Sequence, residues 1–422
     1  PEIAVDPDLI LPVVLPPLLF AATQRATARD FRENSRSILL LAVGLTILTT
    51  VVVAVVGYAA GLGWGPAFVL GAVVAPPDPV AATAVARRLR LPGRLVTVLE
   101  GEGMFNDATA LVLYSVSVAA VVAGSLSAGS LVVALLLAVG VGIGLGLIGG
   151  WLTRVALARL HLAAPETTVT LAVPFAVYLL AEHLNGSGVL AVLTLGLYLR
   201  TFGHTAVTSG GWLLGRAVWR YADYIVTSLV FVFIGFELTA VLRSTPLTSG
   251  ELALAGAVVL VLVVVRFAWL FPAAWLSRLR RSTRGSQGSP VGGRETLVTA
   301  WAGMRGVVTV ATALALPALT EAGEPFPSRT VIVFVGLVVV LATLVVQGLS
   351  LGPLVRRLGV GSEVDVAAEA RALRRRATAT ALEVVRRDGD GVPDRIRAAV
   401  TVQYEGYLAA QDALGTARHG DA

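Results

Sequence analysis

Apolar residues fall in long runs along most of the chain, and short polar segments separate these runs. About eleven runs are candidate membrane spans, because a helix needs about 20 apolar residues to cross the hydrocarbon core of a bilayer. Their approximate limits are 9–22, 36–61, 67–86, 94–123, 127–157, 166–182, 186–202, 215–242, 250–276, 295–318 and 327–352. The first run is short, and we expect it to be shortened or kinked at Pro16-Pro17. Continuous apolar runs differ from the alternating strands of a β-barrel, so the pattern predicts helices.

Composition supports the interpretation as an all-α polytopic membrane protein. The 422 residues are 56% hydrophobic and 14% charged, whereas a soluble domain is about a quarter charged. These values exclude an ordinary soluble enzyme and a disordered protein. Cysteine is absent, which excludes disulfides and cysteine-based metal sites, and four scattered histidines do not favour zinc or haem. We therefore expect no cofactor.

Arginine placement predicts how the spans are oriented. All 33 basic residues are arginines, and they gather in alternate loops. These loops hold Arg25, Arg29, Arg32 and Arg36; Arg87, Arg88, Arg90 and Arg94; Arg154 and Arg159; Arg200, Arg216 and Arg220; Arg278, Arg280, Arg281, Arg284 and Arg294; and Arg356 and Arg357. Basic loops face the cytoplasm, so we expect a plasma-membrane protein with a cytoplasmic C-terminus. The net charge of +6 then favours lipid headgroups, rather than nucleic acid, as the anionic partner.

Two regions of the chain differ in composition. Residues 1–358 form the predicted transmembrane domain, whereas residues 359–422 are charged and rich in alanine. The second region predicts one or two short cytoplasmic helices, which are a regulatory or lipid-surface tail or else a solvated tail without a function of its own. The chain begins at Pro1 instead of methionine, which we interpret as an N-terminally trimmed fragment without a visible signal peptide.

Prolines interrupt the run 67–86 near its middle, where residues 75–79 read Ala-Pro-Pro-Asp-Pro. Each proline lacks an N–H donor and clashes with the carbonyl four residues earlier, so the carbonyls of Ala72, Val73 and Ala75 lose their helical partners. Free carbonyls beside the Asp78 carboxylate would form an oxygen-rich site for a small cation. The alternative is a plain kink in which Asp78 caps the next half-helix, and both can hold. The cost of a charge at mid-membrane favours the functional interpretation.

Acidic residues gather in the run 94–123, in the segment Glu100–Asp107. Gly103 and Asp107 are four residues apart and share one helix face, whereas Glu102 and Asn106 share a neighbouring face. An interhelical hydrogen-bonding patch is the alternative to a functional site. Two or three acids within one span are more than such a patch requires, so the segment predicts a site near Asp107.

A third polar group lies in the run 295–318, where residues 301–306 read Trp-Ala-Gly-Met-Arg-Gly. Arg305 is close to mid-span and cannot deprotonate, so it requires a buried counter-charge. Glu102 is the best candidate for this partner, and Arg266 competes with Arg305 for it. A purely structural ion pair and a direct transport role stay open for Arg305.

The two broken runs occupy corresponding places in the two halves of the chain. Six whole spans separate 67–86 from 295–318, so the two cross the membrane in opposite directions. Transporters built from inverted repeats place their interrupted helices in this way. The spacing therefore favours an inverted-repeat transporter.

These segments resemble the monovalent cation:proton antiporter-1 family, the sodium/proton exchangers of the bacterial NhaP type. Residues 71–81 and 99–110 carry the resemblance, and the Asn106-Asp107 pair after the Glu-Gly-Glu run is its most specific element. Trp301–Gly306 resembles the Gly-Gly-Leu-Arg-Gly element of the family, and Leu15–Phe20 resembles an earlier membrane segment. The resemblance covers residues 10–357.

The resemblance implies an inverted-repeat antiporter fold with two interrupted crossing helices. The family fold has about 13 helices, of which this chain would hold about 11, lacking the first two. By the same resemblance, Asp107 carries the proton and the cation, Asp78 is a second Na⁺ ligand, and Asn106 is its neighbour. Glu102 would pair with an arginine such as Arg305. A homodimer, a role in pH homeostasis and electroneutral exchange of one cation for one H⁺ are also implied.

Three positions depart from the common pattern of the family. Pro77 replaces a threonine, Gly103 replaces a serine, and Ala21 replaces an acidic residue. Each change removes an oxygen ligand or a hydrogen-bond partner, for which water and freed carbonyls can substitute. The departures leave Na⁺, Li⁺ and K⁺ open as the transported cation.

The residues predict antiport by competition. Burial disfavours the charged form of Asp107, so a cation that binds at Asp107 and Asp78 must displace a proton. The loaded forms would cross by rocking of one helix bundle against the other. A K⁺/H⁺ antiporter and a sodium-coupled solute symporter are the alternatives. An ion channel lacks support because the polar groups cluster at mid-membrane, and an intramembrane aspartyl protease lacks the Gly-x-Gly-Asp element.

Overall fold

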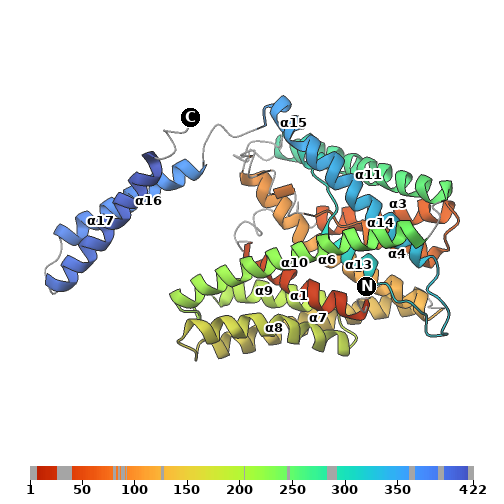
Figure 1. Cartoon of the computed structure of the whole chain (residues 1–422), viewed down its shortest axis with the longest axis horizontal. Coiled ribbons are helices and arrows are strands. Elements are labelled where there is room, and N and C mark those ends of the chain that lie inside the picture. Colours follow the sequence, from red (N-terminus) through yellow and green to blue (C-terminus); the bar gives the residue numbers. More distant parts are fainter. Residues whose placement is uncertain are drawn as a thin grey trace. The chain divides into compact units, whose positions relative to one another are not determined.

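The structure of the chain is a computed structural model. It describes residues 7–25, 40–78, 82–83, 86, 91, 93–124, 128–203, 205–244, 248–282, 292–360, 366–387 and 394–416, nearly all of which are helical (Figure 1). Pro79 of the first proline segment lies outside the described residues. So do several of the loop arginines: Arg29, Arg32, Arg36, Arg87, Arg88, Arg90 and Arg284.

Each predicted apolar run contains helix. The part of the chain that holds these runs contains α1 (Pro7–Arg25), η1 (Leu40–Leu45), α3 (Thr46–Ala59), α4 (Trp64–Val74), α6 (Gly93–Val122), α7 (Ala128–Leu157), α8 (Ala163–His183), α9 (Gly188–Phe202), α10 (Ser209–Ser244), α11 (Ser249–Ser282), α12 (Gly293–Trp301), α13 (Val307–Leu314), α14 (Arg329–Ala342), η2 (Thr343–Gln347) and α15 (Gly348–Leu358). Elements η1 and η2 are turns of π-helix. Helix α1 runs without a break through Pro16-Pro17, where the sequence led us to expect a shortened or kinked span.

The number of membrane spans stays a prediction. Among the described residues, six helices are long and apolar enough to cross a membrane: Ala42–Ala59, Phe105–Val122, Val133–Leu157, Ala163–His183, Ser249–Leu276 and Arg329–Leu358. Three shorter apolar helices lie at Leu9–Gln24, Trp64–Val74 and Gly188–Phe202. Helix α4 is short because it ends at the proline segment.

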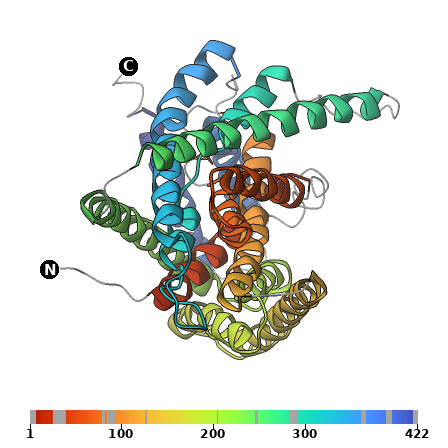
Figure 2. The same ribbon diagram turned by 90° about the vertical axis from the view of Figure 1, so that its right-hand side faces the viewer.

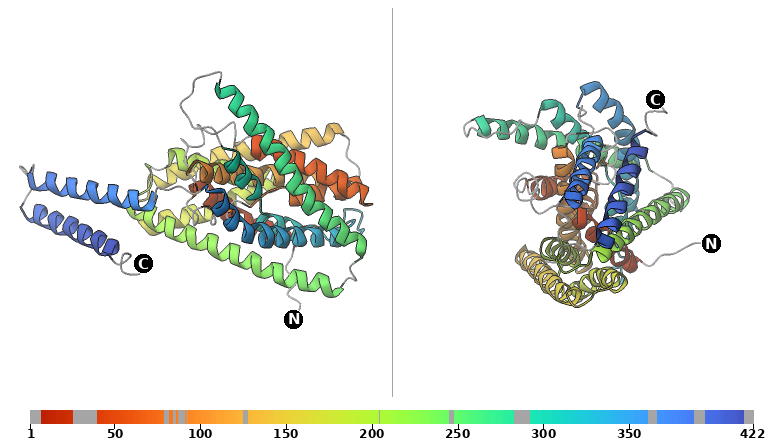
Figure 3. Two further views of the ribbon diagram at one scale, coloured as in Figure 1. Left: turned by 90° about the horizontal axis from the view of Figure 1, so that it is seen from above. Right: turned by 90° about the vertical axis from the view of Figure 1, so that its left-hand side faces the viewer.

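The chain divides into two compact units, Pro1–Val360 and Gly361–Ala422. In the second unit, α16 (Val366–Arg387) packs along α17 (Asp394–Thr416), as Figure 3 shows. An exposed ion pair joins Arg386 to Glu405 at 2.5 Å. The cytoplasmic position of this tail stays a prediction.

The helices of the first unit pack in two groups. One group contains α1, α7, α8, α9 and α10, whose apolar cluster includes Leu15 and Leu195 (Figure 1). The other contains α3, α4, α11, α13 and α14, whose cluster includes Leu70 and Leu337 (Figure 2). Helix α6 contacts α4 of one group and α9 of the other. The acidic segment of α6 therefore lies between the two groups.

Helix α4 packs closely against α3 one turn before α4 ends. A Cβ atom on Gly71 would lie 2.3 Å from the carbonyl oxygen of Thr50, so this contact requires glycine. Gly71 comes about one turn before the proline segment, so the contact places the end of α4 against α3.

Candidate functional site

The first helix break follows α4 directly. Helix α4 ends at Val74, and residues 75–78 have no regular secondary structure. The backbone N–H of Asp78 donates to the carbonyl oxygen of Met304 at 2.6 Å instead of bonding back within its own segment. The prolines thus end the helix, as predicted, and the exposed backbone bonds to a distant part of the chain.

The second break lies between α12 and α13, and it meets the first. Helix α12 ends at Trp301 and α13 begins at Val307. A Cβ atom on Gly306 would lie 1.9 Å from Oδ2 of Asp78, so only glycine allows the Asp78 side chain to occupy this place. Both predicted interruptions are present and touch each other, whereas their relation by an inverted repeat stays a prediction.

Arg305 of the second break satisfies carbonyls of the first. Its Nε donates to the Val74 carbonyl at 3.1 Å, and Nη2 donates to the Ala75 carbonyl at 3.5 Å. Nη1 donates to the carbonyl of Gly303, and the backbone N–H of Arg305 donates to Oγ1 of Thr343 at 3.0 Å. We expected the Ala75 carbonyl to be available to a cation. The guanidinium of Arg305 occupies it instead.

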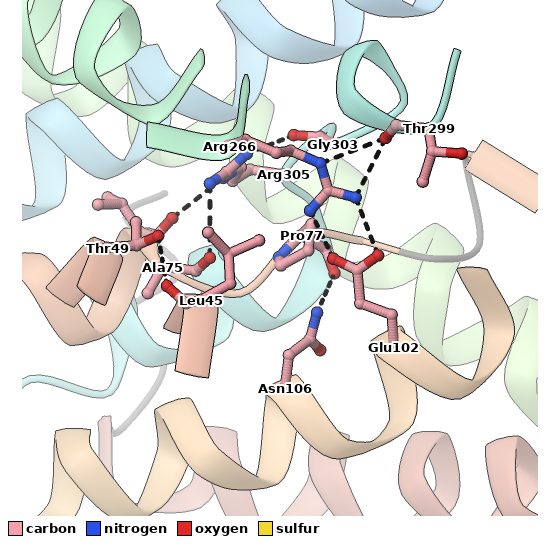
Figure 4. Close-up of polar contacts among 11 residues, drawn as sticks. Leu45, Thr49, Ala75, Pro77, Glu102, Asn106, Arg266, Thr299, Gly303 and Arg305 are labelled. Carbon is pink, nitrogen blue, oxygen red and sulfur yellow. Dashed lines mark hydrogen bonds and ion pairs between the residues drawn. The ribbon is translucent and has the colours of Figure 1, made fainter. Parts of the chain in front are cut away.

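Glu102 pairs with Arg266, so the prediction that it pairs with Arg305 is wrong. Nη1 of Arg266 lies 2.5 Å from Oε1 of Glu102, and Nη2 donates to Oε2 at 2.9 Å (Figure 4). Arg266 also donates to the carbonyl of Thr299 at 3.3 Å. The two charged side chains are 2% and 3% exposed, so the pair is buried and bidentate. Arg305 does not take this role because its donors face the carbonyls of the breaks.

Asn106 and Asp107 connect α6 to the first break. Nδ2 of Asn106 donates to the carbonyl of Pro77 at 3.4 Å (Figure 4), and the fully buried Oδ1 has no hydrogen-bond partner within the described part of the chain. The carboxyl of Asp107 lies close enough to Asp78 for their charges to interact. The structure therefore brings Asp78, Asn106 and Asp107 into one neighbourhood, although 29 residues separate Asp78 from Asp107.

A small pocket lies beside these groups. The residues that line it include Pro77, Asp78, Glu102, Gly103 and Arg266. Two of the three positions that depart from the family pattern, Pro77 and Gly103, thus line the pocket. Ala21, the third, is 5% exposed and packs in the apolar cluster of the first helix group.

Two threonines of the site, Thr299 and Thr343, were not predicted from the sequence. Thr343 binds the backbone of the second break, and Thr299 offers its carbonyl to Arg266. Neither carries a charge, and Thr343 begins the π-helical turn η2, which the sequence does not reveal. Threonine is common in membrane helices, because its hydroxyl bonds to the carbonyl of the preceding turn, so nothing in the sequence marked these two.

The sequence is similar to those of several known proteins. A family profile described as sodium/hydrogen exchanger, transmembrane, matches residues 2–357. A protein of Mycobacterium tuberculosis, described as an uncharacterized Na⁺/H⁺ exchanger, is 36% identical over 394 residues, which cover 91% of this chain and 71% of that protein. The Na⁺/H⁺ antiporter ApNhaP of Aphanothece halophytica is 31% identical over 363 residues, which cover 84% of this chain and 66% of the antiporter.

A solved structure shows the fold. The sodium proton antiporter MjNhaP1 from Methanocaldococcus jannaschii, solved at pH 8, superposes with a TM-score of 0.64 and 20% sequence identity. The superposition covers 85% of this chain and 88% of the solved one. The chain therefore has the fold of that structure.

Proposed function

Because the chain belongs to the sodium/hydrogen exchanger family, a family of membrane-embedded cation/proton antiporters, we propose that it exchanges Na⁺ for H⁺ across the plasma membrane at Asp107 and Asp78. The C-terminal tail lies in the cytoplasm in this proposal. The exchange is electroneutral, with one Na⁺ moved against one H⁺.

The charge balance of the buried site is the observation that carries this proposal. Glu102 and Arg266 neutralise each other through two hydrogen bonds. Among the described residues named above, Arg305 carries one positive charge and Asp78 and Asp107 carry two negative charges when ionised, so these three groups have a net charge of −1. One proton or one monovalent cation neutralises it. This balance supports one-for-one exchange.

Competition follows from the proximity of the two carboxylates. Asp78 and Asp107 repel each other when both are ionised in a site shielded from water, so the pair binds a proton or a cation, and not both. Each loaded form is neutral within the site and moves across the membrane at a lower electrostatic cost than the empty form. The site therefore crosses the membrane with an ion bound and not when it is empty, and this couples the movement of Na⁺ to that of H⁺.

Assembly as a homodimer is part of the proposal. Helix α7 is the least buried of the six long apolar helices, and its exposed side chains include Leu136, Leu137, Ile148 and Trp151. Such an apolar surface suits either lipid or a second copy of the chain.

Exchange in vesicles tests the function. The chain is reconstituted into liposomes with an imposed pH gradient, and a pH-sensitive dye follows the gradient as NaCl is added. We expect the gradient to collapse with the wild type and to persist with Asp107→Asn. Asp223→Asn on α10 is the matched control, because it makes the same change outside the site, and it should behave as the wild type. A gradient that collapses equally with Asp107→Asn would overturn the proposal.

A further inference from the structure

We propose that α16 pairs antiparallel with α16 of a second copy of the chain, through the face that α17 leaves uncovered. The second unit is a hairpin of these two helices (Figure 3). The contact is separate from the one proposed for α7, and it gives the tail the function of joining two copies of the protein.

Burial along α16 shows which of its faces packs on α17. Leu382 is 7% exposed, and Thr378, Ala381 and Val385 are partly buried. These four residues are three or four positions apart, so they share one side of the helix. The opposite side of α16 is the uncovered face.

An exposed stripe of apolar and small side chains runs along the uncovered face. It consists of Leu373, Ala377, Thr380 and Val384, of which Leu373 is 58% and Val384 is 52% exposed. Their spacing of four, three and four residues is that of the contact positions in a coiled coil. The stripe therefore has the geometry of a surface for another helix.

Two opposite charges flank the stripe on the same side. Arg376 precedes Ala377, and Glu383 precedes Val384, so the two charged residues occupy equivalent places beside the stripe, and both are exposed. They are seven residues apart, or about 10 Å along the helix axis, whereas charges on one helix pair at a spacing of three or four residues. One copy of α16 therefore cannot pair Arg376 with Glu383.

A second copy in the antiparallel direction matches the stripe and the charges together. Leu373 of each copy then lies against Val384 of the other, and the smaller Ala377 lies against Thr380. Arg376 of each copy lies beside Glu383 of the other, which gives two ion pairs related by a twofold axis. Charges beside the contact positions set the direction of helix pairing, and a parallel arrangement forms neither ion pair.

This charge pattern favours a second copy over an anionic lipid surface. A lipid surface would attract Arg376 but repel Glu383, which lies equally close to the stripe. The second copy satisfies both charges. The surface is thus complementary to itself, as a twofold contact between identical chains requires.

The contact is small, and the membrane anchor compensates for this. Four stripe positions on each helix are fewer than a stable complex between free proteins requires. Only residues 359–365 separate α15 from α16, so two copies that share a membrane hold their tails at a high effective concentration. We therefore expect the pairing in the full chain in vesicles.

Single cysteines test the arrangement, because the chain has no cysteine of its own. Each variant of the full chain is treated in vesicles with a mild oxidant, and disulfide-linked dimers are measured by gel electrophoresis. Thr380→Cys lies near the twofold axis and should link to itself. Leu373→Cys should not, because antiparallel pairing separates its two copies by about 16 Å, but it should link to co-expressed Val384→Cys. Ala379→Cys is the matched control, exposed but off the stripe, and should not link.

Charge reversal tests the ion pairs in the Thr380→Cys background. Arg376→Glu should slow the crosslinking about tenfold, because two attractive pairs become repulsive. Adding Glu383→Arg should restore the rate, since the reversed charges attract again. Arg374→Glu makes the same change on the other side of the stripe and should have little effect.

Three results would overturn the inference: self-linking of Leu373→Cys, equal linking at positions 379 and 380, or no restoration by the double charge reversal. Protection of Leu373→Cys from a water-soluble thiol reagent by anionic lipid, without linking at position 380, would show that this face meets the membrane instead. Light scattering of the chain in detergent reports dimers independently. A dimer that does not link at position 380 would contradict the tail contact alone, whereas the expected crosslinks without Na⁺/H⁺ exchange would contradict only the proposed function.

Discussion

The two helix breaks at the centre of the molecule have opposite chemistry. The break at 75–78 contains Pro76 and Pro77, lacks their N–H donors and carries the acidic Asp78. The break at 302–306 is rich in glycine, keeps its donors and carries the basic Arg305. One break exposes carbonyls, and the other supplies the guanidinium that binds them. Neither conformation is stable in a low-dielectric environment alone, because unpaired backbone groups there are costly.

This difference explains how two helical segments far apart in the sequence are both interrupted where they meet. The Asp78 N–H donates to the Met304 carbonyl, and the Arg305 side chain donates to two carbonyls of the other break. Each break thus completes hydrogen bonds of the other. The carboxylate of Asp78 remains at the point of contact, against Gly306.

The largest effect is expected from removal of the guanidinium that joins the breaks. Arg305→Ala leaves the Val74, Ala75 and Gly303 carbonyls without this donor, and each buried unsatisfied group costs about 1–3 kcal/mol. The three groups together give an expected loss of about 3–9 kcal/mol in stability, measured by denaturation of the purified chain in detergent, together with loss of exchange. Arg329→Ala is the control, because Arg329 also donates to a carbonyl, that of Leu316, but is only partly buried. Equal stability losses in the two variants would contradict the bridging role.

The next largest loss of stability is expected from breaking the ion pair between Glu102 and Arg266, which lies beside the breaks. Glu102→Gln or Arg266→Gln leaves the other charge buried and unpaired, which costs about 3–5 kcal/mol. The double variant should be destabilised by much less than the sum of the two single variants. Unfolding of all four proteins in detergent provides this double-mutant cycle. Additive losses would show that the two side chains do not depend on each other.

The sequence predicts the positions of both breaks and the residues that carry charge there. Prolines remove helical N–H donors, and residues 75–79 combine three of them with a charged residue inside an apolar run, which marks the first break without any structure. The flanking glycines of Arg305 identify the second. The acidic segment of α6 also stands out, because a charged residue in an apolar run is conspicuous.

The partners of these charges do not follow from the sequence. Two buried arginines, Arg266 and Arg305, are both available to Glu102, and only the packing of α11 against α12 selects Arg266. Carbonyl groups are the same in every residue, so nothing in the sequence shows that Arg305 binds backbone instead of a carboxylate. Helix α1 is a similar case, because the sequence does not reveal that its prolines are tolerated.

A smaller effect is expected where the breaks touch. Gly306→Ala places a methyl group against Oδ2 of Asp78, so the side chain must move. We expect a destabilisation of about 1–3 kcal/mol, typical of overpacking, and weaker Na⁺ binding in titration calorimetry. Gly256→Ala on α11 is the matched control, because its new methyl group meets no atom within 4 Å. Unchanged Na⁺ binding in Gly306→Ala would indicate that the place of Asp78 between the breaks does not affect the site.

The smallest effect is expected from loss of the hydrogen bond by which Thr343, the first residue of η2, supports the second break. Thr343 accepts a hydrogen bond from the Arg305 N–H at 3.0 Å, and its hydroxyl bonds to the Val339 carbonyl at 2.8 Å. Thr343→Val keeps the shape of the side chain but leaves the buried N–H without its acceptor, so we expect a loss of about 1 kcal/mol in stability. Thr343→Ser keeps the hydroxyl and should lose less. Both are measured by denaturation in detergent. Equal stability of the Val and Ser variants would mean that the hydrogen bond from the Arg305 N–H to Thr343 does not stabilise the second break. The guanidinium of Arg305 would then hold the two breaks together without help from the Arg305 backbone.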